Sequence, residues 1–142
     1  MKKVILLFVL ATISSCSSTA VKSTEPNKLY EVLSQQENGG ASIRFFEILS
    51  EANEIAMLQN DENLKNKIST TDIQNANFII LNMGEKSSGG YKIGIETVVE
   101  TATNIIVTVK ETIPEQGSMV TQALTNPFCV VQINSKKAIL FK

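Results

Sequence analysis

The chain has 142 residues, too few for two ordinary domains, and 43% of them are hydrophobic, which is enough to build one core. Its 13 basic and 14 acidic residues are evenly spread, so no basic patch is available to hold nucleic acid or an anionic membrane surface. Histidine is absent, which excludes Ser-His-Asp and Cys-His catalysis and every His-based zinc site.

The N-terminus has the pattern of an export signal. Residues 1–3 form a cationic start, and residues 4–13 are mostly apolar. As a helix this apolar stretch would be only ~15 Å long, too short for the ~30 Å hydrocarbon core of a bilayer. Small residues then precede Cys16, as they do at a signal cleavage site. We therefore predict a signal peptide over residues 1–15.

The motif Ile-Ser-Ser-Cys at residues 13–16 resembles the lipobox of bacterial lipoproteins. The resemblance implies cleavage after Ser15, lipidation of the Cys16 sulfur and acylation (for example with palmitate) of the new amine. Two or more acyl chains make a stable membrane anchor, because each buried methylene contributes ~0.8 kcal/mol. Ser17 stands where many inner-membrane lipoproteins carry an aspartate, so we expect the outer membrane. The alternative is an ordinary secretory signal with a chance cysteine.

The lipidated cysteine is predicted to be followed by a flexible tether, together residues 16–27. Residues 17–27 are rich in serine and threonine and almost free of apolar side chains. Such a segment spans about 18 Å root-mean-square.

The mature chain would be mildly acidic. Loss of the two signal-peptide lysines leaves 11 basic and 14 acidic residues, a formal charge of −3, so lipid rather than charge would make the membrane contact. A single globular domain is expected over residues 28–142.

The domain is predicted to begin with two strands and a helix. Residues 28–35 and 43–49 are both rich in apolar side chains, and an Asn-Gly-Gly turn signal lies between them. We expect these two strands to pair with each other. Ser50 is a suitable N-cap for a short helix of two to three turns. Leu64 and Ile68, one helical turn apart, either extend this helix or follow it.

From residue 78 onward the pattern is that of β structure. Residues 78–81 form a continuous apolar run, which is typical of a strand buried on both faces. Residues 91–100 alternate with period two, which predicts that Tyr91 and the odd-numbered residues up to Val99 face inward. A tight connection should lead to a strand over 105–110 that pairs back as a hairpin.

Two further strands are expected, at residues 128–133 and 138–141. Cys129 lies in the first of them, and we predict that it is a small buried hydrophobe and not half of a disulfide. The total is about seven strands and one short helix. The predicted fold class is mainly β (α+β): a twisted antiparallel sheet, folded into a sandwich or partial barrel, with the helix packed on it.

Acidic residues in these strands are candidates for catalysis or binding. Glu96 and Glu100 are predicted to share the outer face of one strand, about 13 Å apart, beyond the ~9.5 Å limit of a glycosidase acid pair. Glu111 has the parity of Val107 and Val109, so it should point toward the inner face near a strand end. A carboxylate there needs backbone N–H partners or a cation.

A family resemblance rests on three pieces in register. They are Gly89-Gly90-Tyr91, a strand end that runs from Glu111 to Pro114, and the sequence VTQALTNPF at residues 120–128. Their order and spacing resemble the C-terminal domain of the PrcB family, whose founding member is a lipoprotein subunit of a surface protease complex. We assign residues 78–142 to the PrcB-like part.

The resemblance implies a protein-binding role and brings no catalytic residues. It assigns Gly89, Gly90 and Tyr91 to a structural turn. The candidate partner-binding residues, at the strand end and in the polar loop after it, are Glu111, Pro114, Met119, Thr121, Gln122, Thr125 and Pro127.

The leading hypothesis is a non-catalytic lipoprotein that holds a partner protein through its sheet and the 114–127 loop. The resemblance implies a surface or periplasmic protease as the partner. A second hypothesis is that the loop enters a protease cleft and inhibits it. A hydrolase acting on envelope material is disfavoured by the absence of histidine and of an acid pair, and a small-ligand carrier is left open. No metal, cofactor or nucleic acid is expected.

Overall fold

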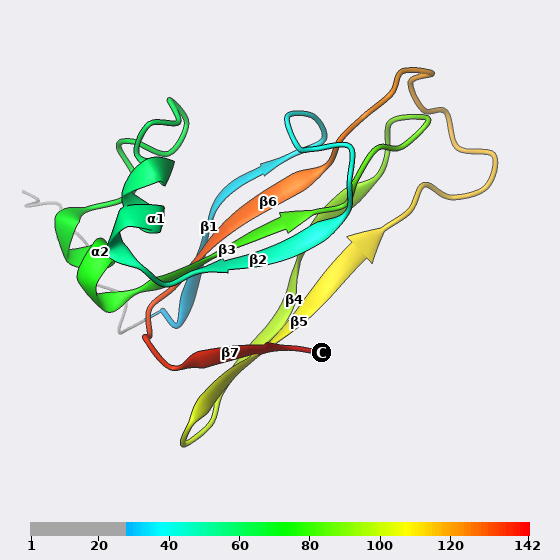
Figure 1. Cartoon of the computed structure of the whole chain (residues 1–142). Coiled ribbons are helices and arrows are strands. Elements are labelled where there is room, and N and C mark those ends of the chain that lie inside the picture. The colour runs from blue at the N-terminus through cyan, green and yellow to red at the C-terminus, as the bar shows by residue number, and fades with distance from the viewer. Residues whose placement is uncertain (1–27) are drawn as a thin grey trace, which may run out of the picture.

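A computed structural model of the chain describes residues 28–142 (Figure 1). The predicted signal peptide, the lipidation site Cys16 and the tether lie outside these residues. Within the described part, no helix is both long and apolar enough to cross a membrane.

Seven strands form two sheets that pack face to face as a sandwich, and two helices cover the outer face of one sheet (Figure 1). The larger sheet has the order β1-β6-β3-β2 and is antiparallel; its strands are β1 (Tyr30–Gln36), β6 (Phe128–Ile133), β3 (Asn77–Asn82) and β2 (Phe45–Leu49). The smaller sheet has the order β4-β5-β7, with strands β4 (Lys92–Glu100), β5 (Asn104–Thr112) and β7 (Ala138–Phe141). The predicted seven strands, the β4–β5 hairpin and the mainly β class are confirmed. The pairing of β5 with β7 is parallel, unlike the rest.

The predicted pairing of the first two strands is wrong. β1 pairs with β6, and β2 pairs with β3, so the two strands lie on opposite edges of the larger sheet. The reason is the hydrophobicity of β3 and β6, whose apolar residues need burial on both faces. Only the two central positions of a sheet covered on both sides provide that, which leaves the edges to the more polar strands.

The core has two parts, one on each face of the larger sheet. Ile79 and Leu81 of β3 point between the sheets with Cys129 and Val131 of β6, whereas Phe78 points toward the helices. This alternation confirms that residues 78–81 form a strand buried on both faces. Cys129 is a free, fully buried cysteine, as predicted, and burial raises the pKa of its thiol to about 12.

The outer layer contains two helices instead of the single one predicted: α1 (Ala52–Leu58) and α2 (Thr70–Asn75). Leu64 and Ile68 lie in the turns between them and are buried against the sheet. The helical path breaks there because Ser69 starts α2 as its N-cap. The N-cap of α1 is Glu51 and not the predicted Ser50. Glu51 has extended backbone angles, and its N–H donates to the carboxylate of Glu54, three residues later, in a capping box.

A β-bulge in β4 changes which side chains face inward. Ile95 pairs with Val109 and Thr97 pairs with Thr108, so Glu96 is an extra residue without a partner on β5. Because a one-residue insertion reverses the facing of every residue after it, Val98 packs on the core and Val99 is exposed. The prediction that Thr97 and Val99 face inward, and that Glu96 and Glu100 share the outer face, is therefore wrong.

Candidate functional site

Three loops meet at one end of the sandwich, and we call this region the loop end: the β1–β2 loop (37–44), the β3–β4 loop (83–91) and the β5–β6 loop (113–127). In Figure 1 the β5–β6 loop projects beyond the sheets, opposite the helices. Backbone hydrogen bonds tie the loops together: Gly40 N donates to Asn126 O (3.0 Å), Glu85 N to Ser42 O (3.0 Å) and Met83 N to Pro127 O (2.9 Å). The loop end is thus one braced unit.

The long β5–β6 loop is attached to the β3–β4 loop at two points. Lys86 and Thr125 exchange two backbone hydrogen bonds, of 2.8 and 2.9 Å. Gly89 N donates to Thr121 O (2.9 Å). The Thr125 hydroxyl also donates to Ser88 O (2.7 Å). These bonds hold the returning half of the loop in a fixed position.

The predicted turn residues allow this close approach. A Cβ on Gly89 would lie 2.4 Å from the Thr121 hydroxyl oxygen, so a side chain there would collide with the loop. Gly90 has φ of 87°, which favours glycine, and its missing Cβ leaves room for Pro114 and Val120. Tyr91 follows half-buried, and the Lys86 ammonium lies 5.8 Å from its ring centroid.

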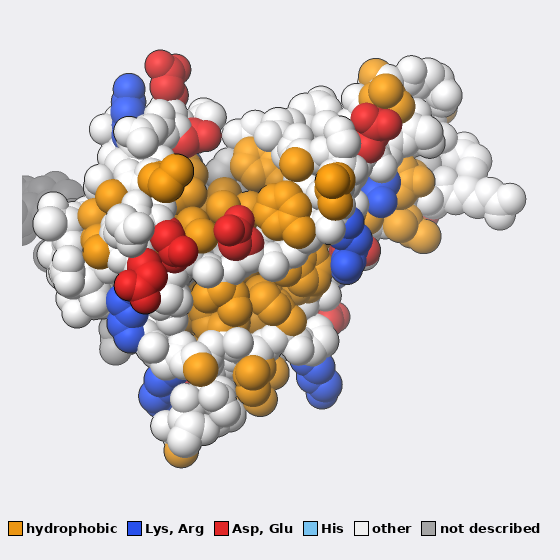
Figure 2. Space-filling view, in the orientation of Figure 1, with side chains coloured by type: hydrophobic (Ala, Val, Ile, Leu, Met, Phe, Trp, Pro, Cys, Tyr) orange, Lys and Arg blue, Asp and Glu red, His pale blue; other side chains and the backbone are white. Residues whose placement is uncertain are grey.

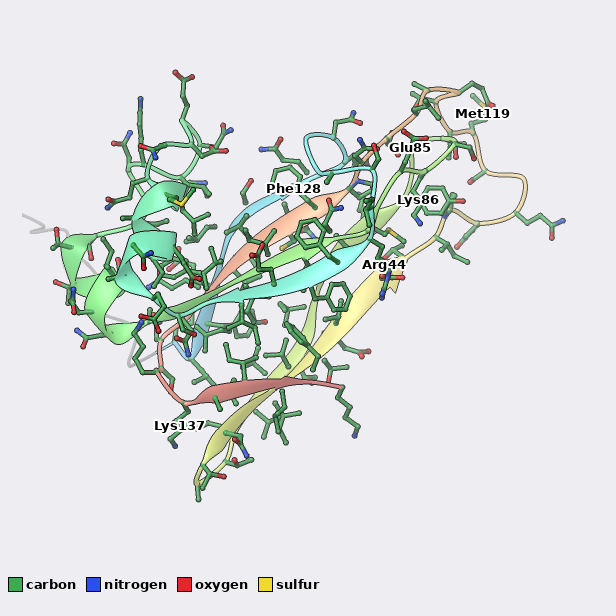
Figure 3. The ribbon with its side chains drawn as sticks, in the orientation of Figure 1. Arg44, Glu85, Lys86, Met119, Phe128 and Lys137 are labelled. Atoms are coloured by element: carbon green, nitrogen blue, oxygen red, sulfur yellow. The ribbon has the colours of Figure 1, made fainter. Side chains whose placement is uncertain are left out.

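Glu111 forms an ion pair with Arg44, in agreement with the prediction that its carboxylate needs a cation or backbone N–H partners. Its Oε1 lies 3.0 Å from Nε of Arg44, which also places its guanidinium 4.5 Å from the ring centroid of Phe46. Glu111 is paired with the buried Ile93 across the hairpin, so it has the inner-face parity expected of it. The side chains of Glu111 and Arg44 are 33% and 56% exposed, so the ion pair lies at the surface of the loop end, where Figure 3 labels Arg44. Because Arg44 directly precedes β2 and Glu111 lies on β5, the pair links the two sheets.

Asn82 and Arg44 are two residues of the site that the sequence prediction missed. Asn82 is buried at the end of β3; its amide donates to the carbonyls of Ala41 and Ile43 and accepts from the Ala41 N–H. It therefore holds the β1–β2 loop against the end of the sheet. The asparagine directly after the apolar run of residues 78–81 is the signal that could have identified it, because a buried amide there needs hydrogen-bond partners.

The candidate partner-binding residues divide into exposed and buried groups. Met119 is fully exposed near the tip of the long loop (Figure 3), and the side chains of Thr121 and Gln122 are also exposed. Thr125 and Pro127 are buried, so they contribute through the shape that they give the loop. Pro114 is half-buried over Gly90.

Large apolar side chains are exposed along the same loop. Ile113 is 69% exposed, Leu124 is 65% exposed, and Ile43 of the neighbouring loop is also exposed. Figure 2 shows hydrophobic side chains on this projecting end of the molecule. Apolar anchors surrounded by polar side chains on a braced scaffold are the composition of a protein-recognition surface. In residues 28–142 no group of three His, Cys, Asp or Glu side chains is placed to hold a metal ion.

Residues 77–134 match the family described as PrcB C-terminal, and no curated protein or solved structure matches the chain. The matched segment runs from the start of β3 to just after β6, so it contains both loops that carry the Gly89–Thr121 and Lys86–Thr125 contacts. The resemblance predicted from the sequence is confirmed. This segment of the chain, from the start of β3 to just after β6, is therefore similar to the PrcB C-terminal family.

Proposed function

We propose that the chain is a non-catalytic, lipid-anchored accessory subunit that binds a surface or periplasmic protease through its loop end. The observation that carries the proposal is the braced β5–β6 loop, which presents Met119, Leu124 and Ile113 to solvent. Large side chains of this kind cost solubility unless a partner covers them. Their place in the PrcB C-terminal segment favours a protease as that partner.

Membrane attachment is the second part of the proposal. It rests on the Ile-Ser-Ser-Cys motif and the apolar leader before it. Lipid on Cys16 would hold the domain near the membrane and raise the local concentration of a partner on the same surface. The residue after the cysteine favours the outer membrane.

Affinity capture tests the accessory role. Full-length protein with a C-terminal tag is expressed in its own host, crosslinked gently and purified, and co-purifying proteins are identified by mass spectrometry. We expect one protease in near-equal amount. Met119→Ala combined with Leu124→Ala should reduce its recovery, as should changes at Thr121 and Gln122. The control is Val99→Ala, which removes an exposed apolar side chain from β4.

Recovery of only abundant envelope proteins would contradict a stable complex. Equal recovery with the loop variants and with Val99→Ala would show that the loop end is not the binding surface. Metabolic labelling with a palmitate analogue tests the anchor separately, because labelling should disappear in Cys16→Ser.

A second candidate function is protease inhibition, and one specific feature favours it. Met119 lies between two fixed points of the loop, the packing of Pro114 on Gly90 and the hydrogen bond from Gly89 to Thr121. A loop that is held on both sides of an exposed apolar residue resists cleavage after binding. An inhibitor would lower the activity of the captured protease and be cut slowly near residue 119, whereas an accessory subunit would leave that activity unchanged or raise it.

A further inference from the structure

A second surface lies on the helical side of the sandwich, away from the loop end. It is a groove of about 270 Å³ between α1 and the outer face of the larger sheet, lined by Glu47, Leu49, Glu54, Met57, Leu58 and Ile80. We call it the α1–β2 groove. Its volume is below the ~300–1,000 Å³ of most small-molecule sites. It therefore suits a few side chains of another protein better than a whole metabolite.

The floor of the groove is apolar and open. Leu49 is buried, Ile80 and Leu58 are half-buried, and Met57 on α1 is 69% exposed at the rim. Figure 2 shows hydrophobic side chains with acidic ones beside them over α1 and β2. Methionine is flexible and polarizable, so Met57 can adapt to different apolar partners.

The rim of the groove is acidic. Glu47 lies on β2 and Glu54 on α1, and Glu51 begins the helix. The Glu54 carboxylate is fixed by hydrogen bonds from the backbone N–H groups of Ser50 (3.3 Å) and Glu51 (3.2 Å). Over residues 28–142 the ion pairs join Arg44 to Glu111, Lys92 to Glu37 and Lys137 to Glu100, so none of them involves a carboxylate of this rim. One cation lies beside the rim: the Lys136 ammonium donates to the Ser50 carbonyl (2.7 Å).

We propose that the α1–β2 groove binds a basic amphipathic segment of a partner protein. Apolar side chains of that segment would pack on Met57, Leu58 and Ile80, and its arginine or lysine side chains would meet Glu47 and Glu54. Charge complementarity selects this occupant, because an acidic segment would be repelled and a purely apolar one would desolvate the Glu47 carboxylate without supplying a cation. This binding site is independent of the loop end and goes beyond the proposed accessory role.

The chain provides its own reporters for a test by NMR. Its four methionines are Met1, Met57, Met83 and Met119; Met57 lies in the groove, Met119 lies on the loop end, and Met83 is buried. Full-length protein with ¹³C-methyl methionine is titrated with a synthetic helical peptide that carries leucine on one face and arginine on the other. The matched control peptides replace all arginines by glutamate, or all leucines by serine.

We expect the leucine–arginine peptide to shift the Met57 methyl signal saturably and to leave Met119 unmoved, with little response to either control peptide. Glu47→Gln should weaken binding about threefold, in the range of a surface ion pair. The matched control is Glu85→Gln, an exposed acid at the loop end that should leave binding unchanged.

Three results would overturn the proposal: an unmoved Met57 signal, an equal response to the glutamate peptide, or equal weakening by Glu47→Gln and Glu85→Gln. A Met57 shift that depends on protein concentration without peptide would assign the groove to a second copy of the chain, and would overturn it too. Capture of a protease through the loop end is unaffected by any of these outcomes.

Discussion

The Thr121 side chain occupies the space that a side chain on Gly89 would need. The Thr121 hydroxyl oxygen lies 2.4 Å from where a Cβ on Gly89 would stand, and Gly89 N donates to Thr121 O at 2.9 Å. The contact joins loops that are far apart in sequence and sets the position of the long loop. The glycine is therefore required by the approach of the loop and not by its own backbone angles.

Substitution of Gly89 by alanine should destabilise the protein and displace the long loop. Overpacking of this kind costs about 1–3 kcal/mol in the free energy of unfolding. Thr121→Ala removes the oxygen that would clash, so the double variant should recover most of that loss. Urea unfolding of both single variants and the double variant measures the coupling. Equal destabilisation with and without Thr121→Ala would show that the clash is not the cause.

The ion pair between Arg44 and Glu111 should contribute little to stability, although it bridges the two sheets. Both side chains are at least a third exposed, so solvent screens the attraction and the coupling should be about 0.5 kcal/mol. A double-mutant cycle with Arg44→Met and Glu111→Gln isolates this coupling from the stacking of Arg44 on Phe46. The coupling should shrink at high salt. A coupling that persists unchanged in high salt would contradict a screened surface pair.

The central strands could be predicted from the sequence because their signal is local. The apolar run at residues 78–81 and the strand around Cys129 are continuous enough that only burial on both faces fits them. The hairpin was also predictable, since its two strands are adjacent and joined by a tight turn. The structure confirms both, with Phe78 and Ile79 on opposite faces of one sheet.

Other features depend on contacts between distant residues, which a single sequence does not reveal. β1 pairs with β6, much later in the chain, and β2 pairs with β3 only beyond the two helices. Arg44 likewise reaches Glu111 across the sandwich. The bulge at Glu96 could not be recognised in the sequence either, because apolar and polar residues alternate around it as they would in a regular strand. At the loop end, the sequence identified the exposed Met119 but not the burial of Thr125, since both lie in one polar stretch.

Cys129 should be unreactive as long as the protein is folded. Burial raises the pKa of its thiol to about 12, so almost no thiolate forms at pH 8, and the sulfur is closed to solvent. In the full-length Cys16→Ser variant, Cys129 is the only remaining cysteine. Its reaction with a thiol reagent should be about a thousandfold slower in buffer than in guanidinium, because it requires unfolding. Comparable rates in the two conditions would contradict a buried thiol.

Asp72 should make stability depend on pH in acid. Burial raises the pKa of its carboxyl, but hydrogen bonds from Ser69 and Gln132 outweigh this and lower the pKa below the ordinary value of 3.8. A carboxyl whose pKa is lowered by folding stabilises the protein above its unfolded pKa, and that contribution is lost as the pH falls through the folded value. Wild type should therefore exceed Asp72→Asn in unfolding free energy at neutral pH, and the difference should shrink below about pH 4. Ser69→Ala, which removes one donor, should reduce this pH-dependent part. A difference between wild type and Asp72→Asn that stays constant from neutral pH to pH 2 would show that these hydrogen bonds do not favour the ionised carboxylate.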